Sequence, residues 1–217
     1  MPLPQISFSR SEIGIRTGLD DDTLSYWIRA GLLIAEHGGG GKGRHRHFSR
    51  LELALAILLS RLRTLGISST ALSSLAERFH AAQRWLRENG LDVVEVGEVN
   101  KLVQARSTQV ASARTPEEAS AQWKVFLKQK TRDPWFELDQ KAIRLAETVP
   151  VEEWNLHQQF HQTLVTIALK RPMAREKYVL LSRQGDGDWH FLKQGDPGDA
   201  LRVSLRSLGQ QIWKGDE

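Results

Sequence analysis

The order of elements in residues 11–75 constrains the fold more than any other feature of the sequence. Two short segments with helical signals, 11–17 and 20–30, meet at a turn that contains Gly18. Four consecutive glycines, Gly38–Gly41, follow, and because glycine has no side chain to pack and disfavours helix, they predict a loop tip. A long apolar segment comes next. Two helices joined by a short glycine-containing turn are typical of a helix-turn-helix.

Capping residues indicate where these two helices begin and end. Ser9 or Ser11 can cap the first helix and Asp20 the second, since short polar side chains accept hydrogen bonds from the free amides at a helix N-terminus. Gly18 and Gly31 then end the helices, because glycine readily takes the left-handed conformation found just after a helix.

The ribbon after the glycines carries a local cluster of positive charge. Lys42, Arg44 and Arg46 alternate with small residues and with His45 and His47. The whole chain has a net charge of only +4, so this clustering is what indicates an anionic partner. A helix of about ten residues fits the major groove of DNA, and cations on an adjacent ribbon suit its phosphates. The pattern therefore favours double-stranded DNA as the partner.

Several spaced motifs in this region resemble the MerR family of winged-helix regulators. The family pattern T-G-x-x-x-x-T-L-R-Y-[YW]-E-x-x-G-L-L is matched by Thr17, Gly18, Thr23, Leu24, Tyr26, Trp27, Gly31, Leu32 and Leu33. Two later family runs are similar to Arg46-His47-Phe48-Ser49 and to Leu62-Arg63-Thr64-Leu65-Gly66-Ile67-Ser68. The resemblance covers residues 11–76, about a third of the chain.

The resemblance implies a sequence-specific transcriptional regulator that binds a pseudo-palindromic DNA site as a homodimer. The second helix would enter the major groove, with Tyr26 and Arg46 on backbone phosphates. The candidate DNA-binding residues are Arg16, Thr23, Ser25, Tyr26, Arg29, Lys42, Arg44, His45, Arg46 and His47.

The second helix departs from the family pattern in ways that bear on DNA binding. Ser25 stands where the family has arginine, which removes one expected phosphate contact, and Ile28 stands where it has glutamate. Asp20, Asp21 and Asp22 place three negative charges where this helix would approach DNA. One of them can be a cap, but together they argue against very tight binding.

A stripe of apolar residues follows Ser68 at alternating spacings of three and four. It consists of Leu72, Leu75, Phe79, Ala82 and Leu86. Such a stripe over two heptads is typical of a coiled-coil seam and predicts a dimerisation helix. A helix that packs on its own domain shows the same stripe, and the sequence leaves both alternatives open.

The second half of the chain predicts helices mixed with a few strands. Val93–Val96 and Leu102–Ala105 look strand-like, and Lys177–Arg183 with Trp189–Lys193 predict a hairpin. Helices are expected over 117–130, 138–148 and 152–170, and a last one after its cap Asp199, with Leu201, Leu205, Leu208 and Ile212 on one face.

The predicted fold is thus mostly α, in three parts. These are a winged helix-turn-helix domain over 1–76, a continuing linker or dimerisation helix over 77–90, and an α+β effector or partner-binding domain with a small sheet or hairpin over 91–217.

The sequence offers no candidate catalytic residues, and no metal site or cofactor is expected. The absence of cysteine excludes disulfides and thiolate metal sites. Nucleotide-binding loops, nucleophile elbows and metalloprotease helices are also absent. Glu153, His157 and His161 share one helical face where histidines four residues apart can hold a metal, but a polar flank beside a core stripe is the ordinary explanation.

The leading interpretation is a cytoplasmic, dimeric regulator whose C-terminal half binds a small-molecule effector or a partner protein. The seven tryptophans can line such a pocket or fill a core. No signal-like stretch or membrane span is evident. The alternative is a MerR-like antitoxin or phage-type DNA binder whose C-terminal half binds a partner protein, which the strand-like 91–114 stretch favours. An enzyme domain fused to a DNA reader needs a convergent polar site in 91–217, and none is evident.

Overall fold

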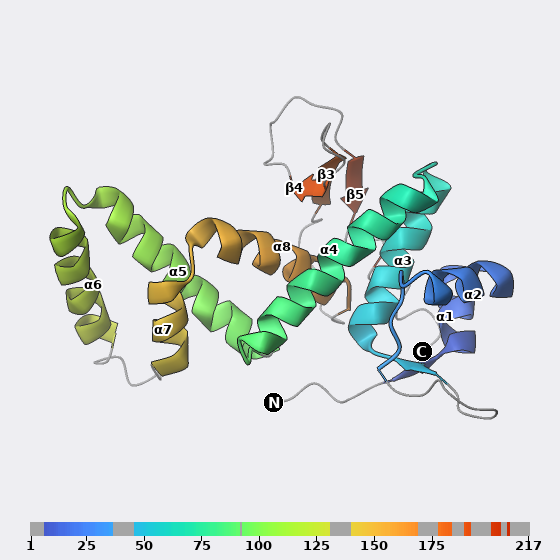
Figure 1. Cartoon of the computed structure of the whole chain (residues 1–217), viewed down its shortest axis with the longest axis horizontal. Helices are drawn as coiled ribbons and strands as arrows, with labels where there is room; N and C mark the ends of the chain where they lie inside the picture. The colour runs from blue at the N-terminus through green and yellow to red at the C-terminus, as the bar shows by residue number, and fades with distance from the viewer. Residues whose placement is uncertain are drawn as a thin grey trace. The chain divides into compact units, whose positions relative to one another are not determined.

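In the computed structural model the chain is mostly helical (Figure 1). The structure describes residues 7–36, 46–91, 93–130, 140–168, 178–183, 189–191, 201–204 and 208. The elements in these ranges are β1 (Phe8–Ser9), α1 (Arg10–Thr17), α2 (Asp21–Arg29), β2 (His47–Phe48), α3 (Arg50–Thr64), α4 (Ser69–Glu88), α5 (Val93–Ser112), α6 (Pro116–Lys130), α7 (Gln140–Thr148), α8 (Val151–Ala168), β3 (Tyr178–Arg183), β4 (Trp189–Phe191) and β5 (Leu201–Ser204).

The contacts divide the chain into two compact units. One unit comprises Met1–Ala81 with Gln159–Glu217, and the other comprises Ala82–Gln158. Helices α4 and α8 each contribute residues to both units. Among the described residues, no helix combines the length and the apolar character that a membrane span requires.

The first two helices begin and end where their capping residues predict. Ser9, rather than Ser11, caps α1 in a reciprocal capping box with Glu12, and Gly18 ends the helix at a φ of 70°. Asp20 caps α2 by accepting a hydrogen bond from the amide of Thr23. The turn between the helices is therefore short, which fixes α1 and α2 as neighbours.

A two-stranded antiparallel ribbon pairs the strand before α1 with the strand before α3. Strands β1 and β2 pair antiparallel, with Phe8 opposite Phe48 and Ser9 opposite His47. Phe8 and Phe48 are both buried. This pairing places Arg46, immediately before β2, close to the start of α1.

The aromatic pair on α2 divides between core and surface. Adjacent residues on a helix cannot share a face, so one side chain of the pair must point outward. Trp27 and Leu24 are buried, while Tyr26 is exposed. The expectation that one member of the pair packs inward is confirmed.

A buried carboxylate ties three elements of this unit together. Ser49 caps α3, and the side chain of Glu52, in its first turn, is buried. One Glu52 oxygen accepts a hydrogen bond of 2.9 Å from the amide of Ile34, and the other lies 3.1 Å from Nε2 of His80 on α4. Glu52 therefore anchors the segment after α2 to both α3 and α4.

The apolar stripe of α4 is buried within the chain itself. Leu72, Leu75, Phe79, Ala82 and Leu86 are each at most 2% exposed. Phe79 makes an edge-to-face contact with Phe160 of α8, with ring centroids 5.0 Å apart. In this conformation the stripe packs on its own chain, which is one of the two alternatives that the sequence leaves open.

The strands expected in 91–114 are wrong, because Val93–Ser112 forms the single helix α5. The β-branched valines suggested strands, yet the buried residues Val96, Val99, Leu102 and Val103 are spaced at three, three and one, which is helical spacing. They join Trp123, Leu145 and Trp154 in one hydrophobic cluster of the unit Ala82–Gln158. Burial against other helices therefore decided the structure of this segment.

Within the described residues, the helices expected over 117–130, 138–148 and 152–170 are confirmed as α6, α7 and α8. Proline opens α6 at its first position, where no backbone amide is needed.

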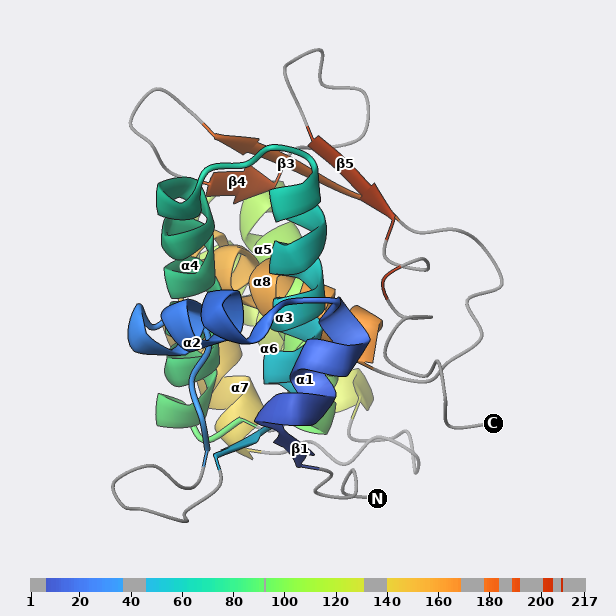
Figure 2. The same cartoon turned by 90° about the vertical axis from the view of Figure 1, so that its right-hand side faces the viewer.

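A three-stranded antiparallel sheet of order β4-β3-β5 lies near the end of the chain (Figure 2). The predicted hairpin is present as β3 and β4. The helix expected after Asp199 is wrong for Leu201–Ser204, which forms β5 and pairs with β3. Of the rest of the expected helical face, Leu208 is described as helical and is buried, while Leu205 and Ile212 lie outside the described residues.

Candidate nucleic-acid interface

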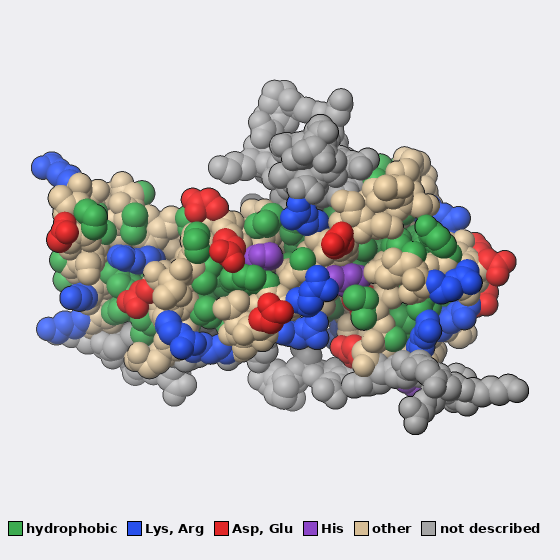
Figure 3. Space-filling model, viewed as in Figure 1, with side chains coloured by type: hydrophobic (Ala, Val, Ile, Leu, Met, Phe, Trp, Pro, Cys, Tyr) green, Lys and Arg blue, Asp and Glu red, His purple; other side chains and the backbone are tan. Residues whose placement is uncertain are grey.

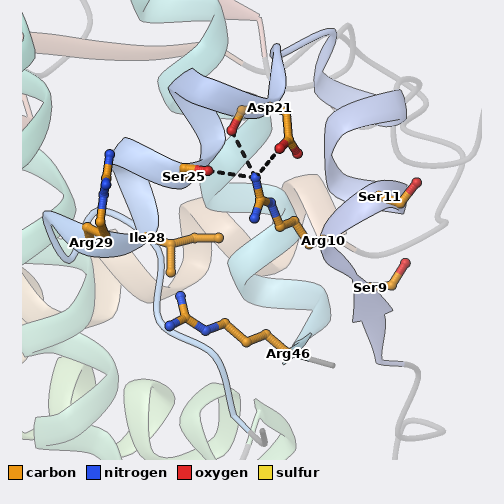
Figure 4. A pocket seen from close by; sticks show the side chains of 8 residues that line it. All are labelled: Ser9, Arg10, Ser11, Asp21, Ser25, Ile28, Arg29 and Arg46. Carbon is orange, nitrogen blue, oxygen red and sulfur yellow. Dashed lines mark hydrogen bonds and ion pairs between the residues drawn. The ribbon is translucent and has the colours of Figure 1, made fainter. Parts of the chain in front are cut away.

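A groove of about 830 Å³ opens beside α2 (Figure 4). Three elements form it: the start of α1, one face of α2 and the residue before β2. The lining residues are Ser9, Arg10, Ser11, Asp21, Ser25, Ile28, Arg29 and Arg46. Three guanidinium groups against one carboxylate give the groove a positive balance, which suits an anionic ligand.

Three of the predicted DNA-binding residues are presented to solvent. Tyr26 is 46% exposed and lies on the outer face of α2. Arg29 and Arg46 are exposed and line the groove, and neither has a hydrogen-bond or ion-pair partner within the described part of the chain. In Figure 4 the side chain of Arg46 runs toward α2.

Four others of the predicted residues are engaged in the fold itself. Thr23 donates from its hydroxyl to Asp20 at 2.8 Å, and Ser25 accepts from Arg10 at 2.6 Å. Arg16 lies over the ring of Phe8, 5.5 Å from its centroid. His47 is a half-buried member of β2. The remaining three, Lys42, Arg44 and His45, lie outside the described residues.

The three aspartates at the start of α2 have different environments. A hydrogen bond from the amide of Thr23, followed by one from its hydroxyl, lowers the pKa of Asp20, so this cap is charged at neutral pH. Asp21 forms an ion pair with Arg10 at 2.6 Å. Asp22 is exposed and, as far as the described residues go, has no partner. Figure 3 shows acidic and basic side chains next to one another over α2.

Two arginines that the sequence did not single out lie against α2. Arg10 donates from Nη2 to the hydroxyl of Ser25 at 2.6 Å and to the carbonyl of Asp21 at 3.0 Å. Arg63 of α3 donates from Nη1 to the hydroxyl of Thr23 at 3.1 Å. No local signal identifies them, because both contacts depend on how α1 and α3 pack on α2.

The three residues considered for a metal site, Glu153, His157 and His161, do not come together as metal ligands among the described residues. Glu153 accepts a hydrogen bond of 2.8 Å from the indole of Trp85, and the ring of His157 stacks on Trp85. His161 is buried, and burial lowers its pKa to about 4. Both of its ring nitrogens lack a hydrogen-bond partner among the described residues. Within those residues no three histidine, cysteine or acidic side chains gather where they could hold a metal ion.

The two described tryptophans after residue 100 whose side chains are placed fill a core. Trp123 and Trp154 are buried, and their indoles donate to Glu147 and Asn100 at 2.7 and 2.9 Å. Trp135 and Trp213 lie outside the described residues, and for Trp189 only the backbone is described.

Comparison with known proteins adds no assignment. No protein-family model matches the chain, and no curated protein and no solved structure matches it significantly. The functional argument therefore rests on the residues around α2.

Proposed function

We propose that this chain is a sequence-specific binder of double-stranded DNA, a transcriptional regulator of the winged helix-turn-helix type that resembles the MerR family. The observation that carries the proposal is the groove beside α2, where Arg29 and Arg46 stand exposed and unpaired among the described residues. Tyr26, on the same helix as Arg29, is also exposed.

The dimensions of α2 suit the major groove. An α-helix with its side chains is about 10–12 Å in diameter, which matches the major-groove width of about 12 Å, and the nine residues of α2 form such a helix. The β1–β2 pairing holds Arg46 beside this helix. A helix in the groove with a cation at its flank combines base contacts with a phosphate contact that fixes its position.

A homodimer on a pseudo-palindromic site belongs to the proposal through the family resemblance alone. The α4 stripe is buried in the chain, so the seam of such a dimer would have to use another surface. The antitoxin interpretation rested on the strand-like 91–114 stretch followed by Thr115-Pro116-Glu117-Glu118, and the helix α5 removes the strands from that argument.

Replacing Arg46 by alanine tests the proposed phosphate contact. Each phosphate that a cation neutralises releases counterions, so the logarithm of the affinity falls with the logarithm of the salt concentration. We expect Arg46→Ala to weaken binding to every duplex sequence and to reduce the magnitude of this slope by about one. Fluorescence anisotropy of a labelled mixed-sequence duplex over a series of salt concentrations measures both quantities.

The matched control is Arg84→Ala, since Arg84 is exposed on α4 and does not line the groove. It removes the same charge from the chain and should leave the slope unchanged. Equal slopes for the wild type and Arg46→Ala would show that Arg46 does not contact a phosphate. Failure of the wild-type chain to bind any duplex at low salt would end the proposed function.

A further inference from the structure

Arg10 is held against α2 by a single nitrogen. Its Nη2 atom contacts the hydroxyl of Ser25 at 2.6 Å, the carbonyl of Asp21 at 3.0 Å and the carboxylate of Asp21 at 2.6 Å. The dashed lines in Figure 4 meet at this atom, and the rest of the guanidinium lies away from both partners. A guanidinium has five N–H donors, so this arrangement leaves donors for another acceptor.

The guanidinium of Arg10 lies next to Ser25, a position of α2 at which α2 itself carries no charge. Ser25 stands where the family pattern resembled by this chain has an arginine, and the Arg10 guanidinium is bonded directly to the Ser25 hydroxyl. The side chain of Arg10 lines the same groove as Arg29 and Arg46 and is 37% exposed. A positive group therefore stands at this point of α2 although it comes from α1.

The hydrogen-bond partners of Arg10 differ in how easily a ligand can displace them. The Ser25 hydroxyl and the Asp21 carbonyl belong to α2 and stay in place when a ligand arrives. The Asp21 carboxylate is 83% exposed, so it can turn into solvent at little cost. A phosphate oxygen offers a guanidinium the same charge-assisted hydrogen bond as a carboxylate oxygen.

We propose that Arg10 is a DNA phosphate-binding residue of this groove, and that Asp21 is its internal counter-ion, which the phosphate displaces. This inference rests on the proposed function and adds to it a contact residue from α1 and an acid that limits the affinity. Ser25 and the Asp21 carbonyl orient the guanidinium before DNA binds, which reduces the conformational entropy lost on binding.

Substitutions at Arg10 and Asp21 test the two parts of the inference in one assay, with a labelled mixed-sequence duplex and anisotropy at several salt concentrations. We expect Arg10→Gln to weaken binding about tenfold at low salt and to reduce the magnitude of the salt slope by about one. Asp21→Asn should tighten binding, because it removes the competitor of the phosphate.

Removing any acid from α2 also tightens binding to a polyanion, and the neighbouring Asp22 measures that general effect. Asp22 is exposed without a partner among the described residues. Asp21→Asn should therefore tighten binding several-fold more than Asp22→Asn does. In the Arg10→Gln background, the two asparagine substitutions should have equal effects, since the competition with Arg10 is then gone.

The paired change Arg10→Ser with Ser25→Arg serves as a second test should Arg10→Gln unfold, which its thermal transition reports. It moves the guanidinium onto α2 and should retain most of the affinity and the salt slope. Wild-type affinity and slope in Arg10→Gln, or equal effects of Asp21→Asn and Asp22→Asn in the wild-type background, would overturn the inference while leaving the proposed function intact. A wild-type chain that binds no duplex would overturn both.

Discussion

Replacing Glu52 by alanine is expected to lower the free energy of unfolding by about 3 kcal/mol, because it leaves buried polar groups without partners. The amide of Ile34 loses its acceptor, and Nε2 of His80 loses the carboxylate 3.1 Å away. The ring of His80 is buried, so water cannot easily replace the contact that it loses, whereas Ile34 is 46% exposed and contributes less to the loss. Urea denaturation followed by circular dichroism measures the change.

Two other substitutions distinguish the effect of losing the hydrogen bonds of Glu52 from the effect of losing its negative charge. Glu52→Gln keeps an oxygen for the amide of Ile34, so we expect a smaller loss than for alanine. Glu77→Ala removes an exposed acid of α4 and should change the stability by less than about 0.5 kcal/mol. An unfolding free energy of Glu52→Ala within that margin of the wild type would contradict this account of the core.

Glu52 also connects the core with the proposed interface. Its side chain accepts a hydrogen bond from the amide of Ile34. Two residues after Ile34, the amide of Glu36 donates a hydrogen bond of 2.9 Å to the carbonyl of His47. His47 follows Arg46 directly. Glu52→Ala should therefore also weaken duplex binding by loosening the segment that positions Arg46, even at a temperature where the variant is folded.

The buried ring of His161 is expected to make the fold sensitive to acid. Its pKa falls from 6.5 to about 4 because burial disfavours the charged ring. Between these two pH values the unfolded chain binds a proton at this histidine and the folded chain does not. Acidification through that window should therefore cost about 3 kcal/mol of stability from this group alone.

His161→Leu removes this pH dependence and fills the same apolar surroundings. The variant should exceed the wild type in stability near pH 4.5, and the difference should shrink as the pH rises toward 6.5 and stay constant above that value. The account of His161 is wrong if the unfolding free energies of the wild type and His161→Leu run parallel from pH 4 to 7.

Local rules were enough to predict the elements around the proposed interface. The cap at Ser9, the turn at Gly18 and the cap at Asp20 depend on neighbouring residues only, and the helices begin and end there. The hairpin β3–β4 is equally local, since a turn-forming stretch separates its two strands.

The features that the sequence did not predict depend on tertiary contacts. The valine-rich segment Val93–Ser112 is a helix because it packs in a helical core, and Leu201–Ser204 is a strand because β3 is available to pair with it. The contact between Arg10 and Ser25 joins residues 15 apart on two helices. A pattern of single residues cannot show that an arginine on one helix is bonded to a serine on another.

Selection of bound sequences from a library of random duplexes tests the central claim most directly. The full chain is incubated with the library at low salt, and the retained duplexes are amplified and sequenced over several rounds. The proposed function predicts enrichment of one common motif, arranged as an inverted repeat if the chain binds as a homodimer. Arg29→Ala and Tyr26→Ala should weaken retention of that motif. A chain that retains no duplex, or that retains duplexes without enriching any sequence, would contradict the claim that it is a sequence-specific DNA-binding protein.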